Sequence, residues 1–147
     1  MDIQTVSGYA EADVQALAVP VFKDEKADEG LLKELDEMTG GVVRAVLESE
    51  ELKGKEGETA YIHLSGTEMG NGRRLLLVGA GERDDYQLGQ IAKAAGTAVR
   101  FLRARSVKSV GIIPRAPEGT EAERAASSAV EGALMGLFEP DKYRTVD

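Results

Sequence analysis

The chain has 147 residues but no cysteine, no tryptophan and a single histidine, His63. Disulfide bonds are therefore excluded, and so is a metal site built within this chain from thiolates or from several imidazoles. No apolar run approaches the ~20 residues that a membrane-spanning helix requires. The segment Met1–Gln4 offers neither the basic residues nor the apolar stretch of a signal peptide. These absences lead us to expect a cytoplasmic protein.

What is present is the composition of a globular domain, with 42% apolar and 30% charged residues. A chain of this length can bury about 68–70% of its unfolded surface and hold one core without covalent or metal cross-links. We find no internal repeat and no low-complexity segment. Length and composition together predict one domain that folds on its own.

Acidic side chains outnumber basic ones by 26 to 18, which gives a formal net charge of -8. This charge argues against a general affinity for nucleic acid, because that affinity depends on Lys and Arg displacing counterions from phosphates. The acidic excess lies in residues 1–60, which carry 15 acidic and 6 basic side chains, against 11 and 12 in residues 61–147. A solvated acidic face on the first helices is the simplest interpretation, and an acidic interaction surface is the alternative.

The centre of the chain predicts one strand–helix–strand unit. The strand Arg73–Gly79 contains a short unbroken apolar run, which is typical of a central strand covered on both faces. A helix over about Gln87–Arg105, with Asp84 and Asp85 as possible N-caps, leads to a second strand, Val107–Ile113. A right-handed crossover to a parallel strand is the expected connection.

One apolar face of this helix is expected to lie on the sheet. Its members recur at helical spacing: Leu88, Ile91, Ala92, Ala95, Ala98, Val99 and Leu102. Ala94 and Phe101 fall near the back of the helix and do not fit this face. An isolated exposed Phe101 is the simplest interpretation, and a partner surface that covers it is the alternative.

The N-terminal half predicts two strands, two short helices and a third strand. These are Ile3–Ser7, Asp13–Phe22, helices from near Asp28 to Met38 and from Val42 to near Ser49, and Thr59–Ser65. Pro20 cannot donate to a ladder, so we place it at an edge, at a bulge or where its strand leaves its neighbour. The Asn71-Gly72 dipeptide predicts a hairpin into Arg73, and hence one antiparallel pair.

The last helix is predicted from about Glu121 to Phe138, with Thr120 as its N-cap and Glu123 completing a capping box. The face expected to pack on the sheet comprises Ala122, Ala126, Val130, Ala133 and Leu137. A flank of small residues can admit another backbone, either within this domain, which we favour, or from a partner: Ala125, Ala129, Gly132 and Gly136. The elements predict an α/β fold, a three-layer sandwich with a mixed, mostly parallel sheet.

Residues 79–81, Gly79-Ala80-Gly81, invite a dinucleotide-binding interpretation because they follow a strand and precede a helix. Asp84 stands where the third glycine of that fingerprint would be, and Glu82, Asp84 and Asp85 put carboxylates where a pyrophosphate would sit. We therefore favour a tight turn, with acids that complement the dipole of the following helix.

No other motif supplies an active site. We expect His63 to be a partly buried strand residue and not a catalytic base, since no sequence-local partner accompanies it. The run Glu48, Glu50 and Glu51 at a helix end is expected to be solvated. No Gly-x-Ser-x-Gly, Gly-x-x-x-x-Gly-Lys or His-Glu-x-x-His pattern is present. We therefore assign no catalytic, cofactor-binding or metal-binding residue.

A basic cluster lies at the end of the central helix: Arg100, Arg103, Arg105 and Lys108. Positive charge in the last helical turn interacts favourably with the helix dipole, which is the interpretation we favour. A nucleic-acid or partner contact is the alternative, for which the cluster is a weak signal.

The residues resemble the N-terminal domain of the leucyl aminopeptidases, the cytosolic two-metal aminopeptidases of peptidase family M17. The resemblance covers nearly the whole chain and rests on the order and spacing of several short segments. They are Leu35-Asp36 with Gly40-Gly41, Leu52-Lys53-Gly54-Lys55-Glu56-Gly57-Glu58-Thr59, Arg74-Leu75-Leu76-Leu77-Val78-Gly79-Ala80-Gly81, Ala95-Gly96, and Glu131-Gly132 to Tyr143-Arg144-Thr145.

The resemblance implies a macro-domain-like N-terminal accessory domain over residues 1–142, with residues 143–147 beginning a linker to a C-terminal peptidase domain. In the family that second domain holds two divalent metals, zinc, manganese or magnesium, and releases N-terminal residues such as leucine from peptides. The family signature Asn-Thr-Asp-Ala-Glu-Gly-Arg-Leu is absent from these 147 residues. No metal ligand or catalytic residue therefore carries over, and we expect no cofactor and no enzyme activity in this chain alone.

Members of the family are typically homohexamers in which N-terminal domains lie outward of a catalytic core. We therefore expect a non-catalytic domain that serves assembly and substrate access, with the peptidase domain of the same polypeptide as its partner and no membrane. A macro-like module that binds an ADP-ribose-type nucleotide is one alternative. A DNA-contacting regulatory module, as in some bacterial members, is another, which the acidic charge disfavours.

Overall fold

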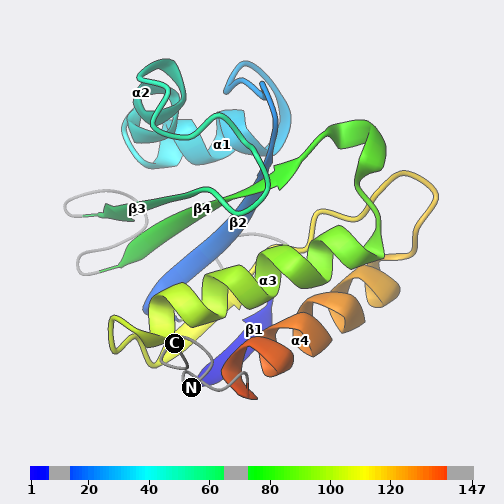
Figure 1. Ribbon diagram of the computed structural model, residues 1–147. Helices are drawn as coiled ribbons and strands as arrows, with labels where there is room; N and C mark the ends of the chain where they lie inside the picture. The colour runs from blue at the N-terminus through cyan, green and yellow to red at the C-terminus, as the bar shows by residue number, and fades with distance from the viewer. Residues whose placement is uncertain (7–13, 65–72, 139–147) are drawn as a thin grey trace, which may run out of the picture.

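The computed structural model describes residues 1–6, 14–64 and 73–138, which form one sheet with helices on both of its faces (Figure 1). The spatial order of the strands is β1 (Asp2–Thr5), β5 (Ser109–Ile112), β2 (Ala16–Phe22), β4 (Arg74–Gly81) and β3 (Thr59–His63). Neighbours are parallel except β4 and β3, which are antiparallel. The predicted mixed sheet and its antiparallel pair are confirmed, although Asn71-Gly72 of the predicted hairpin lies outside the described residues.

The helices form the two outer layers. α1 (Gly30–Met38) and α2 (Val42–Glu48) lie on one face of the sheet, and α3 (Leu88–Arg103) and α4 (Ala122–Phe138) lie on the other (Figure 1). This arrangement confirms the predicted α/β three-layer sandwich. The predicted strand ends at Ser7, Asp13 and Ser65 lie outside the described residues.

Strand β2 joins the two halves of the core. Leu17, Val19 and Val21 belong to the cluster packed under α1 and α2, whereas Ala16 and Ala18 belong to the cluster packed under α3 and α4. All seven residues of β2 are buried. A strand covered on both faces cannot alternate apolar and polar residues, which explains its continuous apolar sequence.

Pro20 lies in β2 beyond the point where β5 has separated from it. β5 pairs only with Ala16–Ala18, and the carbonyl oxygen of Pro20 accepts a hydrogen bond from Nη1 of Arg115 at 3.0 Å. The next N–H on this side, that of Phe22, donates to the carboxylate of Glu25 at 3.0 Å. Pro20 therefore lies where its strand leaves a neighbour, as predicted, and no ladder bond is lost.

The connection from β4 through α3 to β5 crosses over β2, which lies between these two parallel strands. Strand β4 extends to Gly81, and Asp84 and Asp85 lie in a short 3-10 helix, η1 (Arg83–Asp85). The residue before α3 is Gln87, whose backbone N–H donates to Oε1 of Gln90 at 3.0 Å. The predicted N-caps were wrong because the extra turn of η1 separates the two aspartates from the helix.

α4 packs mainly on α3, through the smallest residues of both helices. A β-carbon at Gly132 would overlap the carbonyl oxygen of Ala92, and one at Gly136 would lie 2.8 Å from that of Gly96. The buried residues of α4 are Ala125, Ala129, Gly132, Ala133 and Gly136. The small-residue flank is therefore the packed face, within this domain.

The predicted sheet-packing face of α4 is confirmed for Ala133, which is buried, and in part for Leu137, which packs against the core cluster, but was wrong for the other members. Ala122 is exposed, and Ala126, Val130 and Leu137 are partly exposed. Close helix–helix packing selects residues without bulk, so apolar size is a poor guide to the buried face of this helix. The helix also begins at Ala122, which makes Glu121 and not Thr120 the residue before it.

The predicted inward face of α3 is confirmed for Ile91, Ala95, Ala98, Val99 and Leu102, which are buried. Ala94, predicted to face outward, is only 7% exposed. Helical periodicity counts angle and ignores size, and a single methyl group needs little cover to be buried.

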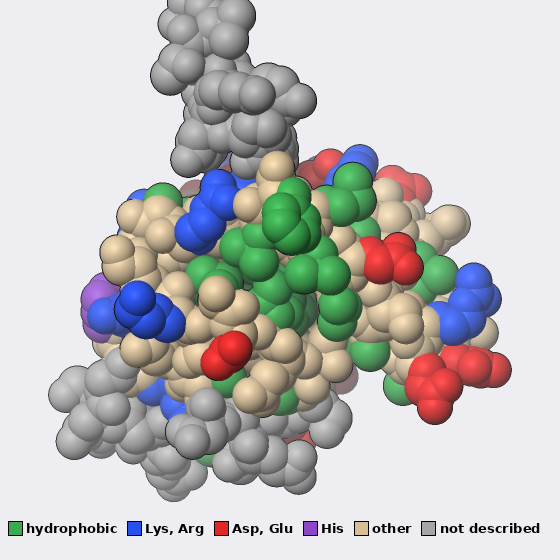
Figure 2. All heavy atoms as spheres, turned by 90° about the horizontal axis from the view of Figure 1, so that it is seen from below, with side chains coloured by type: hydrophobic (Ala, Val, Ile, Leu, Met, Phe, Trp, Pro, Cys, Tyr) green, Lys and Arg blue, Asp and Glu red, His purple; other side chains and the backbone are tan. Residues whose placement is uncertain are grey.

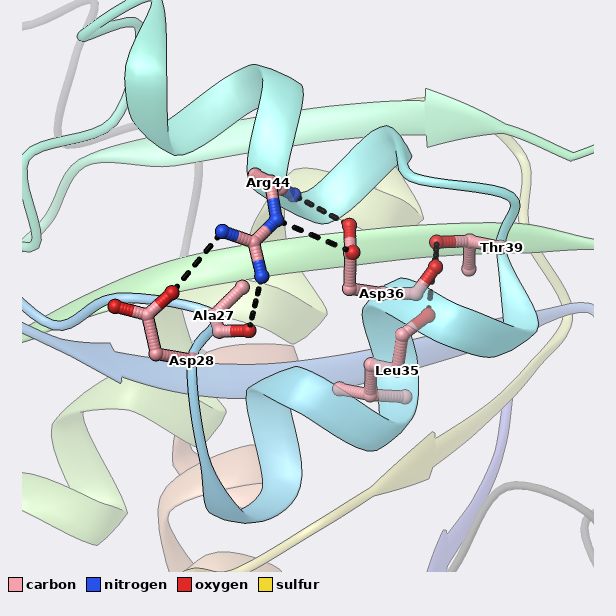
Figure 3. Close-up of polar contacts among 6 residues, drawn as sticks. All are labelled: Ala27, Asp28, Leu35, Asp36, Thr39 and Arg44. Atoms are coloured by element: carbon pink, nitrogen blue, oxygen red, sulfur yellow. Dashed lines mark hydrogen bonds and ion pairs between the residues drawn. The ribbon is translucent and has the colours of Figure 1, made fainter.

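Arg44 ties α2 to α1 and to the segment before it (Figure 3). Its Nη1 lies 3.0 Å from Oδ1 of Asp28, and its Nη2 donates to the carbonyl oxygen of Ala27 at 2.9 Å. Its backbone N–H donates to Oδ1 of Asp36 at 2.7 Å, and its Nε lies 3.7 Å from the other carboxylate oxygen. Asp36 is 8% exposed, so these contacts pair a carboxylate that would otherwise be buried without a donor.

Candidate interaction surface

The carboxyl ends of the parallel strands, where open α/β sheets commonly bind ligands, are occupied by a cluster of the chain's own side chains. Glu25 follows β2, and Arg115 follows β5 and binds it through two contacts of 2.7 Å, Nη1 to Oε1 and Nη2 to Oε2. Arg83 follows β4 and places Nη2 3.4 Å from Oε2 of Glu25. The Glu25 and Arg115 side chains are 9% and 14% exposed. This bidentate pair links the ends of β2 and β5, and the contact of Arg83 with Glu25 adds the end of β4.

Aromatic rings complete this strand-end cluster. The guanidinium carbons of Arg83 and Arg115 lie 4.3 Å and 4.6 Å from the ring centroid of Phe22, a cation–π arrangement. The Tyr86 ring packs edge-on against Phe22 at 4.6 Å between centroids. The Tyr86 hydroxyl is buried and has no hydrogen-bond partner among the described residues, and burial raises its pKa well above the usual value. Packing explains the cluster without a ligand.

The glycines at the end of β4 serve backbone packing and not phosphate binding. A β-carbon at Gly79 would overlap the carbonyl oxygen of Lys55. The backbone N–H of Gly79 donates to the carbonyl of Glu58 at 2.7 Å, and that of Gly81 donates to the carbonyl of Gly54 at 2.8 Å. The dinucleotide interpretation therefore fails, because these N–H groups are already bonded. The tight turn is also wrong at these positions, since they belong to the strand.

His63 is exposed and not partly buried as predicted. It is the last residue of β3, an edge strand, and its ring packs edge-on against Tyr61 with centroids 5.0 Å apart. The end of an edge strand has few neighbours to cover a side chain. Glu48, Glu50 and Glu51 are exposed, as predicted.

The basic cluster of α3 is divided among three roles. Arg103 donates to the carbonyl of Leu137 near the end of α4, and Nη1 of Arg105 donates to the carbonyl of Phe101 at 3.0 Å. The Arg105 guanidinium also lies 3.5 Å from the Phe101 ring centroid. Arg100 instead lines a groove between α3 and α4. Arg105 thus binds a carbonyl in the last turns of α3, in line with the interpretation that we favoured, whereas Arg103 binds one at the end of α4.

Phe101 is not isolated. Its ring is partly buried, lies 5.2 Å from that of Tyr61 and carries Arg105 on one face. The interpretation as an isolated exposed side chain was wrong, because β3 and Arg105 cover part of the ring from within the domain; a partner surface over the remainder stays a prediction.

The groove between α3 and α4 has a volume of about 890 Å³. Its floor includes Gly96 and Thr97 of α3, one wall includes Gly132 and Met135 of α4, and Glu56 lies on the other side. Glu56 forms an exposed ion pair with Lys93, with Nζ 3.4 Å from Oε1. The groove is thus largely apolar, with charges at its edge.

The wall formed by α4 continues into an exposed apolar patch, which we define as Leu134, Met135 and Phe138. Their exposed fractions are 42%, 73% and 79%. Figure 2, which views the molecule from below, shows hydrophobic side chains gathered in the middle of this face. Exposed patches of this kind mark contacts with other protein surfaces.

The sequence pattern did not identify this patch. Leu134, Met135 and Phe138 would have been recognised as outward-facing if the buried arc of α4 had been centred on Gly132 and Gly136.

In the described residues, no helix has the length and apolar character to cross a membrane. The same part of the chain contains no group of three or more His, Asp or Glu side chains arranged to hold a metal ion.

Together these features define an α/β three-layer domain whose strand ends are filled by its own side chains and whose last helix has an exposed apolar face. Its fold is similar to that of a tomato leucine aminopeptidase mutant, with a TM-score of 0.74 and 21% identity over 95% of this chain and 28% of that one. It is also similar to the macrodomain of Mycobacterium tuberculosis DarG, with a TM-score of 0.66 and 16% identity over 90% of both chains. At these identities the similarity is one of fold.

Sequence comparison is more specific. Residues 18–147 match the N-terminal domain of the cytosol aminopeptidase family. A probable cytosol aminopeptidase of Solibacter usitatus is 36% identical over 138 residues, which cover 94% of this chain and 25% of that protein. The chain belongs to the cytosol aminopeptidase family, as its N-terminal domain. It spans about a quarter of the length of that relative.

Proposed function

We propose that this chain is the non-catalytic N-terminal domain of a metal-dependent leucyl aminopeptidase, where it serves assembly of the enzyme and access of substrate. The observation that carries the proposal is the family match over residues 18–147, in a chain that covers only 25% of its S. usitatus relative. Most of that relative lies outside the matched domain, and the catalytic residues are expected there.

The complete enzyme is proposed to be a cytoplasmic homohexamer that uses two divalent metals to release N-terminal amino acids, preferably leucine. The donors present here do not fit such a metal pair, because the described residues offer no cluster of three or more carboxylate or imidazole groups. We therefore assign no step of the reaction to this chain.

The described surfaces favour a role in protein contacts. The strand ends, the usual ligand position of the fold, hold the largely covered pair of Glu25 and Arg115, whose side chains are 9% and 14% exposed. The last turns of α4 instead present exposed Met135 and Phe138, residue types enriched in protein interfaces. A domain with these two features is suited to packing against another protein surface.

The ADP-ribose alternative has less support, because a nucleotide at the strand ends would have to displace Glu25 and Arg115. Saturating ADP-ribose is expected to leave the melting temperature of the chain unchanged. A ligand that does bind the folded chain, present at 100 times its Kd, would raise the free energy of unfolding by about 2.7 kcal/mol and hence the melting temperature. A clear stabilisation would favour the nucleotide-binding module.

The DNA alternative likewise loses support, because Arg103 and Arg105 already bind carbonyl groups. Salt-sensitive retention of the chain on DNA would restore that support.

The decisive experiment is a leucyl-anilide hydrolysis assay with manganese, run on residues 1–147 and on the product of the complete reading frame. We expect turnover only in the longer protein, abolished by a chelator and restored by metal. Chelator-sensitive turnover by the 147-residue chain alone would contradict the non-catalytic assignment. Turnover by neither protein would mean that the resemblance is one of fold without the activity.

A further inference from the structure

The apolar patch of Leu134, Met135 and Phe138 lies in the last turns of α4, beside the groove floored by α3. Leu134 and Met135 are more exposed than is usual for such side chains in a helix that packs on a core, at 42% and 73%. The groove and the patch share Met135 and Phe138, so they form one continuous surface. We call this surface the α3–α4 face.

The α3–α4 face is preformed. Gly132 and Gly136 bring the backbone of α4 into direct contact with Ala92 and Gly96 of α3, so the two helices cannot approach more closely to cover the apolar side chains. Arg103 also binds the carbonyl of Leu137 at the end of α4. A rigid surface loses little entropy when another segment docks on it.

The position of the patch indicates what covers it. It ends at Phe138, the last described residue of the domain, so any polypeptide that follows is held next to it at high effective concentration. The relatives carry such polypeptide, since this chain spans only 25% of the S. usitatus protein. A tethered partner meets this face before any free protein does.

We propose that the α3–α4 face is the docking surface for the C-terminal, catalytic portion of the same polypeptide, and that Met135 and Phe138 are its buried anchors. This inference rests on the proposed function, because it requires the longer protein. The docked segment is expected to be apolar where it meets Met135 and Phe138, which line the groove.

Peroxide oxidation of Met135 reports directly on docking, because oxidation of methionine follows its exposure. Residues 1–147 and the complete protein are treated with dilute hydrogen peroxide, and sulfoxide formation is followed by mass spectrometry at Met135, Met38 and Met1. We expect Met135 to react at least about 10-fold more slowly in the complete protein, with Met38 unchanged. Equal rates at Met135 would overturn the proposal.

A variant pair separates docking from general stabilisation. In the complete protein, Phe138→Asp is expected to restore the fast oxidation of Met135, because it places a carboxylate in the apolar contact. Ser127→Asp adds the same charge to an exposed position of α4 outside the groove and is expected to leave Met135 protected. Fast oxidation in both variants, or in neither, would contradict a docking site at this face.

Two further outcomes distinguish the occupant and the function. If Met135 of the 147-residue chain becomes protected as its concentration rises, with a matching dimer in sedimentation, a second copy covers the face and the proposal is wrong. If the complete protein hydrolyses leucyl-anilide but leaves Met135 reactive, docking fails while the proposed function holds. Protection of Met135 without hydrolysis would support docking and count against the aminopeptidase activity.

Discussion

Tyr86 combines a ring that packs well with a hydroxyl that has no partner. The ring lies edge-on to Phe22, and the hydroxyl is buried without a hydrogen bond in the part of the chain that the structure describes. A buried hydroxyl that has lost water without gaining a partner costs about 1–3 kcal/mol. The aromatic contact therefore keeps Tyr86 in the strand-end cluster against this cost.

Replacing Tyr86 by Phe is expected to leave the domain at least as stable at pH 7, with a gain of about 1 kcal/mol. Burial raises the pKa of Tyr86 in the folded state above the unfolded value of 10. The neutral hydroxyl of Tyr86 therefore makes its full contribution to the free energy of unfolding below about pH 10. That contribution is lost as pH rises through the folded pKa, by about 1.4 kcal/mol per pH unit.

Urea unfolding of the parent and of Tyr86→Phe from pH 7 to pH 11 checks this expectation. The difference in unfolding free energy between the two proteins is expected to widen above about pH 10 in favour of the variant. A constant difference across this range would mean that Tyr86 ionises equally easily in the folded and unfolded chain.

At the scale of elements, the contact between α3 and α4 depends on the absence of side chains. Gly132 lies where a β-carbon would overlap the carbonyl of Ala92. Gly132→Ala is therefore expected to destabilise the domain by about 1–3 kcal/mol, although alanine is the better helix former. Thermal and urea unfolding measure the loss.

Gly89→Ala is the matched control for this substitution. Gly89 lies in the first turn of α3 and is exposed, and outside its own helix turn no atom of the described residues lies within 4 Å of a β-carbon built on it. Alanine there is expected to stabilise the domain by about 0.5–1 kcal/mol. Equal effects at both positions would mean that helix propensity and not packing sets the response at Gly132.

At the scale of the whole molecule, the two hydrophobic clusters share the central strands β2 and β4. Strands β2 and β4 contribute alternate residues to both clusters, for example Leu17 and Leu75 to one and Ala18 and Leu76 to the other. Losing either outer layer would expose one complete face of these central strands. The strands thus couple α1 and α2 to α3 and α4.

We expect residues 1–147 to unfold in one cooperative transition. Far-ultraviolet dichroism, tyrosine fluorescence and calorimetry are expected to report the same midpoint, with equal calorimetric and van't Hoff enthalpies. Separate transitions for helix content and tyrosine environment would show that one layer melts first, in which case α1 and α2, the shorter helices, are the candidates.

The sequence pattern was sufficient to predict the fold where the burial of an element depends only on its own apolar residues. The unbroken apolar run of β4 required cover on both faces, and this predicted a central strand. The alternation of strands with helices predicted the three layers. The resemblance carried by segments such as Arg74-Leu75-Leu76-Leu77-Val78-Gly79-Ala80-Gly81 indicated the family. The absence of cysteine and of a second histidine excluded whole classes of site.

Only the tertiary structure decided the features that depend on which elements meet. The glycines of α4 became its buried face because α3 lies against them, and Met135 and Phe138 were left outside for the same reason. Glu25, Arg83 and Arg115 are far apart in the chain and meet because parallel strands end at one edge. The periodicity of apolar residues in the sequence shows only which way each side chain points from its own helix or strand. Which elements touch, how closely they approach and which side chains fill the strand ends depend on several elements at once.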